Sequence, residues 1–178
     1  MPLFRKAARR DPLIIAMTGA ALGSRVLMLC AQDESMPIDV AAKVGLSGRA
    51  VALAPDTAQS ERIGRRAARR GVFVELGLIG VPLPHADHEF DLVIADGRHG
   101  GAEATAPLRE AVRVLRPGGR IVVLGPAPRW WTWRAAPPAE AWQAAGALER
   151  SLLDAGFRAA REIGAREGVR FVEAARGV

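Results

Sequence analysis

The sequence predicts an α/β protein with a mostly parallel sheet. Short apolar runs, such as 25–31 and 120–126, alternate with longer segments that carry charges on one side, such as 56–71. This alternation is typical of parallel strands joined by crossover helices that cover both faces of a sheet. The end of the chain differs, because 158–177 is predicted to form two strands joined by a turn near Gly168. We therefore expect an antiparallel hairpin to complete the sheet.

Local signals set the expected boundaries of each element. The run 25–31 is apolar throughout and short enough for a strand buried on both faces. Pro37 in a first turn and Gly45 at an end delimit one helix, and Asp56 is suited to cap the next. Further strands are predicted over 48–54, 72–79, 90–97 and 120–126. Helices are predicted over 11–23, 36–45, 56–71, 100–119 and 138–157.

Length and composition indicate one globular domain. The chain has 178 residues and a formal net charge of +6, and we expect a basic arm over 1–10 and a single domain over 11–178. The positive charge favours an acidic partner, either an acidic protein surface or an anionic membrane. A nucleic acid is a weaker candidate, because the basic stripe of the chain has no obvious base-stacking platform beside it, although its tryptophans could supply one.

The few cysteines and histidines limit the chemistry. Cys30 is the single cysteine, which excludes a disulfide framework and a cysteine-based zinc site. His85 and His88 stand three residues apart around Asp87, a spacing that resembles a metal-binding pair. We interpret this stretch instead as a polar turn before a strand, and we expect no metal.

The apolar segment near the start of the chain resembles a signal peptide, but two residues argue against that interpretation. Arg25 falls inside the apolar stretch, and Leu29 stands where a lipoprotein cleavage site needs a small residue before Cys30. The polar break around Ser24 also disfavours a spanning helix. We expect a cytoplasmic protein and leave association with a membrane surface open.

Three stretches carry a resemblance to a known family. They are "LREAVRVLRPGGRIVVLGP" at 108–126, "LPHADHEFDLVIAD" at 83–96, and "AGF" before the final hairpin. On these motifs the chain resembles the class I S-adenosylmethionine-dependent methyltransferases of the quinone-methyltransferase type. The resemblance covers almost the whole chain. It implies a Rossmann-like, doubly wound sheet of seven strands in the order 3-2-1-4-5-7-6, with strand 7 antiparallel.

The glycine-rich loop that this family uses to approach its cofactor is absent. Without gaps, the three glycine positions of the family's motif fall on Cys30, Gln32 and Glu34, and an early aspartate position falls on Met28. Glycines matter in such a loop because they allow a tight turn and let the backbone approach a ligand. Cys30, Gln32 and Glu34 would therefore bind a cofactor only if the site has been rebuilt.

The acidic residues that the resemblance implies are also missing. Ala54 stands where the family places a ribose-binding acid, and Ile79 where it often places an adenine-binding one. Asp56 lies two residues beyond Ala54 and could reach back, but we favour a helix N-cap role for it. Asp96 occupies the usual rim position at the end of a strand and is a weak candidate for a catalytic base. No other catalytic residue is expected.

Two segments are candidates for a partner or membrane surface. The Trp-rich segment follows a strand at the rim where open α/β sheets bind ligands, and tryptophan beside arginine is typical of binding surfaces and membrane interfaces. Its residues are Arg129, Trp130, Trp131, Trp133 and Arg134. The alternative is a loop that folds back with its tryptophans in the core. Arg62, Arg65, Arg66 and Arg69 share a helix face that is either solvated or bound by an acidic partner.

Three hypotheses follow for function. The first is a methyltransferase-fold protein with a degenerate S-adenosylmethionine pocket, which binds no cofactor and serves as a binding or structural subunit. The second is an active S-adenosylmethionine-dependent methyltransferase with a rewired cofactor site and a small or lipophilic acceptor. The third is a peripheral protein of anionic membranes. We favour the first because all three cofactor-binding features depart together, and the loss of two carboxylates would cost on the order of 3–6 kcal/mol of binding free energy.

Overall fold

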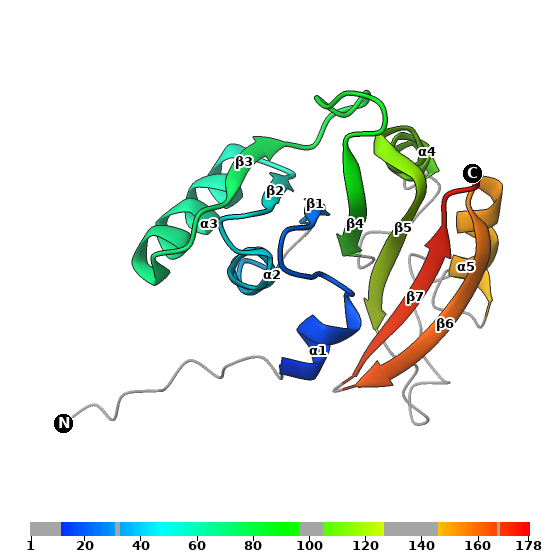
Figure 1. The fold of residues 1–178 in the computed structure, drawn as a ribbon, viewed down its shortest axis with the longest axis horizontal. Coiled ribbons are helices and arrows are strands. Elements are labelled where there is room, and N and C mark those ends of the chain that lie inside the picture. Colours follow the sequence, from blue (N-terminus) through cyan, green and yellow to red (C-terminus); the bar gives the residue numbers. More distant parts are fainter. Residues whose placement is uncertain (1–11, 31–32, 97–104, 127–145, 167) are drawn as a thin grey trace.

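The computed structural model describes residues 12–30, 33–96, 105–126, 146–166 and 168–178 (Figure 1). These residues form a seven-stranded sheet in the order β3-β2-β1-β4-β5-β7-β6. The strands are β1 (Arg25–Leu29), β2 (Arg49–Ala54), β3 (Glu75–Leu78), β4 (Phe90–Asp96), β5 (Leu115–Pro126), β6 (Arg158–Arg166) and β7 (Val169–Ala175). The helices are α1 (Pro12–Met17), α2 (Met36–Val44), α3 (Thr57–Arg70), α4 (Thr105–Val114) and α5 (Ala147–Asp154).

The direction of the strands agrees with the predicted fold. The first five strands pair in parallel, with Leu27 of β1 opposite both Val51 of β2 and Val93 of β4. β7 pairs antiparallel with β5 on one side and with β6 on the other. The predicted seven-stranded order with an antiparallel strand 7 is confirmed.

Helices cover both faces of the sheet, and each face has its own core. On one face α1, α2 and α3 pack on side chains such as Met28 and Ile94, and on the other α4 and α5 pack on side chains such as Leu27 and Val93. Successive residues of β1 and β4 point to opposite faces, so both faces of these central strands are apolar. This explains why the sequence shows continuous apolar runs rather than alternation.

Most predicted elements are present with shorter bounds. The first helix ends at Met17 and the third strand starts at Glu75, whereas the sequence predicted 11–23 and 72–79. α5 begins at Ala147 in the structure, and the predicted helical residues 138–145 lie outside the described part.

The sequence predicts that the "RPGG" stretch ends a helix, but in the structure it lies within a strand. α4 ends at Val114, and β5 begins at once with Leu115, which pairs with Phe90. A register irregularity then lies between Phe90 and Leu92 of β4. Gly118 has a φ of 73°, and a Cβ on Gly119 would lie 2.9 Å from the carbonyl oxygen of Arg116. The two glycines therefore form a tight irregularity inside the strand, which a helix-ending pattern in the sequence does not reveal.

Candidate functional site

The site lies where the order of the strands reverses. From β1 the chain builds the sheet toward β3, and from β4 it builds toward β5, so β1 and β4 lie side by side at the reversal. Open α/β sheets bind ligands in the crevice outside the carboxyl ends of such strands. Here Leu29 of β1 pairs with Ala95 of β4, and the next residues are Cys30 and Asp96. The structure therefore brings together two of the residues that the sequence singled out.

Cys30 and Asp96 differ in exposure. Cys30 is 5% exposed and belongs to the core on the α2 side of the sheet. Its burial raises the pKa of the thiol to about 12, and the nearby charge of Asp96 adds to the rise. Asp96 lies at the boundary with solvent, although its Oδ2 atom is buried. Cys30 is thus a packed apolar side chain, whereas Asp96 offers a carboxylate at the switch point.

The loop after β1 is held by its own side chains. Asp33 Oδ1 accepts hydrogen bonds from the backbone N–H groups of Ser35 at 2.8 Å and Met36 at 3.3 Å, which satisfies free donors at the start of α2. Glu34 reaches across to α3, where its carboxylate pairs with Arg62 at 2.6 Å and Arg66 at 3.6 Å. Glu34, just before the start of α2, is therefore tied to α3.

Two further side chains connect this loop to α3. Asp56 caps α3 by accepting a hydrogen bond from the N–H of Gln59 at 2.7 Å, which confirms the N-cap interpretation. The buried Gln59 amide donates to the carbonyl oxygen of Cys30 at 3.4 Å. Sequence reasoning missed Gln59. Its spacing of three residues from the cap was the available signal, but that spacing does not indicate which backbone group the side chain reaches.

The positions expected to carry acids are apolar in the structure as well. Ala54 is fully buried in the same core as Cys30. Ile79 packs against the core on the other face, and its N–H donates to the carbonyl oxygen of Ala54 at 2.8 Å. The ends of β2 and β3 therefore present backbone and methyl groups where the resemblance implies carboxylates.

The predicted arginine surface divides into two parts. Arg62 and Arg66 face α2 and pair with Glu34, while Arg65 pairs with Glu61 on its own helix at 3.3 Å. The predicted single stripe is therefore partly neutralised. Arg69 is exposed and donates to the carbonyl oxygen of Arg65 at 3.3 Å. The remaining predicted residues lie outside the described part of the chain, so their roles stay predictions. They are Gln32, the basic arm 1–10, and Arg129, Trp130, Trp131, Trp133 and Arg134.

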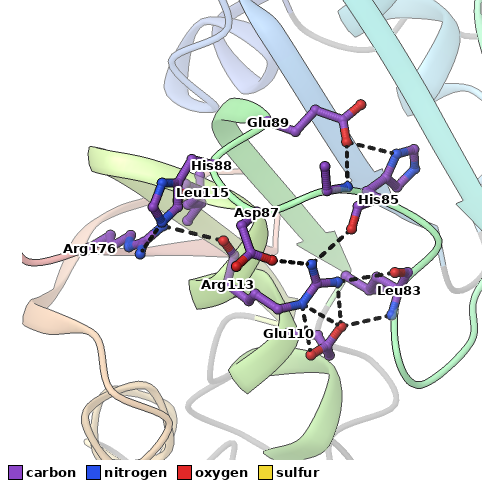
Figure 2. A network of polar contacts seen from close by, with 10 residues as sticks. Leu83, His85, Asp87, His88, Glu89, Glu110, Arg113, Leu115 and Arg176 are labelled. Atoms are coloured by element: carbon purple, nitrogen blue, oxygen red, sulfur yellow. Dashed lines mark hydrogen bonds and ion pairs between the residues drawn. The ribbon is translucent and has the colours of Figure 1, made fainter.

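The histidine-containing turn lies just before β4, at the opposite end of that strand from Asp96, and Figure 2 shows its polar network. The Arg113 guanidinium donates to Glu110 and Asp87 at 2.7 Å and to the carbonyl oxygens of His85 at 2.8 Å and Leu83 at 3.1 Å. Within the described residues no group of three His, Cys, Asp or Glu side chains is placed to hold a metal. The network ties a turn to the end of α4.

Across the same described residues, no helix has the length and apolar character that a bilayer crossing requires.

Comparison with known proteins identifies the family of this chain. A family model described as a methyltransferase domain matches residues 34–123, which is half of the chain. The chain belongs to this methyltransferase domain family. The ubiquinone/menaquinone biosynthesis C-methyltransferase UbiE of Azotobacter vinelandii is 34% identical over 117 residues, which cover 62% of this chain and 45% of that protein. The chain thus spans under half the length of this curated relative.

Solved structures agree on the fold. A SAM-dependent methyltransferase from Aquifex aeolicus superposes with a TM-score of 0.77 at 19% identity, covering 92% of this chain and 88% of that one. The [4+2]-cyclase SpnF superposes with a TM-score of 0.69 at 19% identity, covering 93% and 79%. The fold is therefore the methyltransferase fold, and it is shared by a protein named as a [4+2]-cyclase.

Proposed function

We propose that this chain is an S-adenosylmethionine-dependent methyltransferase with a rebuilt cofactor site, acting on a small lipophilic acceptor. The observation that carries the proposal is the Asp96 carboxylate at the end of β4, beside Cys30 at the switch point of the sheet. Membership of the methyltransferase domain family supports the cofactor. The name of the Azotobacter relative, a C-methyltransferase of quinone biosynthesis, supports a lipophilic acceptor.

The residues present fit this cofactor in part. S-adenosylmethionine carries positive charge on its sulfonium and amino groups, and the carboxylate of Asp96 is suited to pair with such a group. Ala54 and Ile79 offer no side-chain acceptor for a ribose or an adenine amino group. Hydrogen bonds to charged groups contribute about 1.5–3 kcal/mol each, so the absence of two carboxylates predicts weak binding.

The chain's own part in the reaction is positioning. S-adenosylmethionine supplies an electrophilic methyl group when it is bound. Asp96 would pair with a positive group of the bound molecule at the switch point, while α3 fixes Cys30 through Gln59 and Glu34 through Arg62. Positioning alone can contribute much of the rate of a transfer reaction, so the proposal needs no further acid or base among the described residues.

Isothermal titration calorimetry of the full chain with S-adenosylmethionine and S-adenosylhomocysteine tests this function. We expect saturable binding with a dissociation constant weakened by about a hundredfold or more relative to a site with both carboxylates. Circular dichroism on the same sample establishes that the chain is folded. A folded chain that shows no heat of binding up to millimolar ligand would contradict the proposal.

A second candidate is a non-catalytic binding or structural subunit. It is favoured by one observation: Cys30, Glu34 and Asp56 are already committed to the core, to α3 and to a helix cap. Absence of cofactor binding in the calorimetric experiment would support this candidate. The third hypothesis, binding to anionic membranes, is tested separately by co-sedimentation with vesicles that contain phosphatidylserine at low salt, and absence of binding there would exclude it.

A further inference from the structure

The two edge strands of the sheet differ in how well they are protected against pairing with another chain. β6 forms one edge and carries Arg158, Arg161 and Arg166, with irregular register against β7. Ala159 and Gly164 on this strand have positive φ values of 53° and 151°. Charged side chains and bulges are typical devices that prevent an edge strand from pairing with another chain. β6 is therefore a blocked edge.

β3 forms the other edge and lacks these devices. Leu76 and Leu78 on this strand are 40% and 46% exposed, and the flanking Phe73 and Val81 are 70% and 62% exposed. The one charged residue of the strand, Glu75, is bonded inward to Arg49 at 2.8 Å. An apolar edge strand of this kind is a template for pairing with a further strand.

The backbone N–H and C=O groups of β3 that face away from the sheet belong to the two exposed leucines, Leu76 and Leu78. The N–H of Ile79 donates inward to Ala54, and backbone groups alternate in direction along a strand. The N–H and C=O groups of Leu76 and Leu78 therefore point away from β2. Within the described part of the chain no strand lies on that side of β3.

The exposed residues are arranged symmetrically about Gly77. In an antiparallel pairing of two copies centred on Gly77, Leu76 of one copy lies opposite Leu78 of the other and exchanges both backbone hydrogen bonds with it. The exposed Phe73 and Val81 flank the paired strands, each four residues from Gly77. A twofold interface requires such self-complementarity, because each residue must meet its counterpart twice.

The flank of the neighbouring helix leaves room for the same arrangement. Gly64 of α3 lies beside Leu76, since a Cβ on Gly64 would be 3.0 Å from that side chain. The flank of α3 above the edge therefore carries small residues, Ser60 and Ala68 being one turn either side. In the pair, α3 would run antiparallel to its copy.

The distance between the two copies of α3 is also compatible with this dimer. α3 packs on both β2 and β3, and neighbouring strands lie about 4.8 Å apart. Joining two β3 strands would therefore place the two copies of α3 about 10 Å apart, which is a normal separation for packed helices. We propose that two copies of this chain form a twofold dimer through antiparallel pairing of β3, centred on Gly77, giving one continuous sheet.

Sedimentation equilibrium of the full chain from micromolar to submillimolar concentration tests the dimer. We expect a reversible monomer–dimer equilibrium for the wild type. Leu78→Lys should raise the dimer dissociation constant by at least about tenfold, because it places two like charges beside the centre of the interface. Leu153→Lys is the matched control, since Leu153 is 48% exposed on α5, which packs against β6 and β7 at the other end of the strand order, and its dimer should be unchanged.

A second variant probes the backbone. Leu78→Pro removes an N–H that points outward, and edge strands tolerate proline at such positions, so the monomer should stay folded while the dimer weakens. In the wild type, hydrogen exchange of the Leu76 and Leu78 amides should slow as concentration rises. A wild type that stays monomeric throughout, or a dimer that both Leu78 variants leave intact, would overturn the proposal.

Discussion

Cys30 illustrates how the same residue has different meanings in the sequence and in the structure. In the sequence it occupies a cofactor-loop position, where a thiol could be reactive. In the structure it is 5% exposed, and burial, together with the charge of Asp96, raises its pKa to about 12. Thiolate is the reactive form of cysteine, so a thiol with this pKa is inert near neutral pH.

This predicts that Cys30 resists alkylation in the native protein. Iodoacetamide at neutral or mildly alkaline pH should leave the folded chain unmodified, whereas the chain in guanidinium chloride should react fully. Mass spectrometry provides the measurement, and the single cysteine makes the result unambiguous. Rapid alkylation of the folded chain would mean that the loop after β1 opens and exposes the thiol.

In the proposed function, Asp96 is the described residue that would contact the cofactor most directly. If its carboxylate pairs with a positive group of S-adenosylmethionine, Asp96→Asn should weaken binding by about tenfold to a hundredfold, as expected for loss of a charged hydrogen bond. Calorimetry measures the change. Asp154→Asn, at an exposed position on α5, is the matched control and should bind like the wild type. Equal affinities for the two variants would remove Asp96 from the site.

At the scale of elements, the turn before β4 depends on one arginine at the end of α4. Arg113 donates to Glu110 and to the carbonyl oxygens of Leu83 and His85, and it is also bonded to the exposed Asp87 (Figure 2). Without the guanidinium, the partly buried Glu110 would lose its charged partner. Unlike a lone surface ion pair, this side chain holds several backbone groups together.

Arg113→Ala should therefore lower the free energy of unfolding by about 2 kcal/mol, after allowance for partial solvent exposure. Urea denaturation followed by circular dichroism measures the loss. Arg109→Ala lies one turn earlier on the same helix at an exposed position, so it should change stability by less than about 0.5 kcal/mol. A loss as large for Arg109→Ala as for Arg113→Ala would contradict this role for the network.

The elements that sequence could predict are those with strong local patterns. β1 and β4 are continuous apolar runs, and α3 has a cap at Asp56 and a glycine at its end, so their existence followed directly. The start of β5 did not follow, because two glycines inside a strand look like the end of a helix. In the candidate site, Asp96 and Cys30 were predictable from their positions after strands. The contacts from Gln59 and Glu34 to other elements depend on the packing of α3, which no local pattern encodes.

At the scale of the whole molecule, acidic side chains are tied to arginines on separate elements. Arg49 of β2 donates to Glu75 of β3 at 2.8 Å and also bonds Glu89 before β4. Arg113 of α4 donates to Asp87 in the turn before β4 at 2.7 Å, and to Glu110 on its own helix at 2.7 Å. These contacts join separate strands and turns. Protonation of the glutamates at low pH therefore weakens several parts of the fold together.

Lowering the pH should therefore decrease the free energy of unfolding. The hydrogen bond from Arg49 lowers the pKa of Glu75, and that from Arg113 lowers the pKa of Glu110. Burial of Glu89 raises its pKa, but Arg49, the N–H of Ala86 and nearby positive charge outweigh burial and lower it overall. A carboxyl group whose pKa is lower in the folded state stabilises the fold above its unfolded value and loses that contribution as the pH falls through the folded value.

Stability should hold near neutral pH and decline once the pH drops below the ordinary glutamate value of 4.5. The midpoint of urea unfolding, measured across this range, provides the test. Arg49→Ala removes the partner shared by Glu75 and Glu89, so both groups should titrate closer to their ordinary value and the acid-induced decline should become shallower. If Arg49→Ala lowered stability by the same amount at every pH, the glutamates would not be the groups that couple protonation to unfolding.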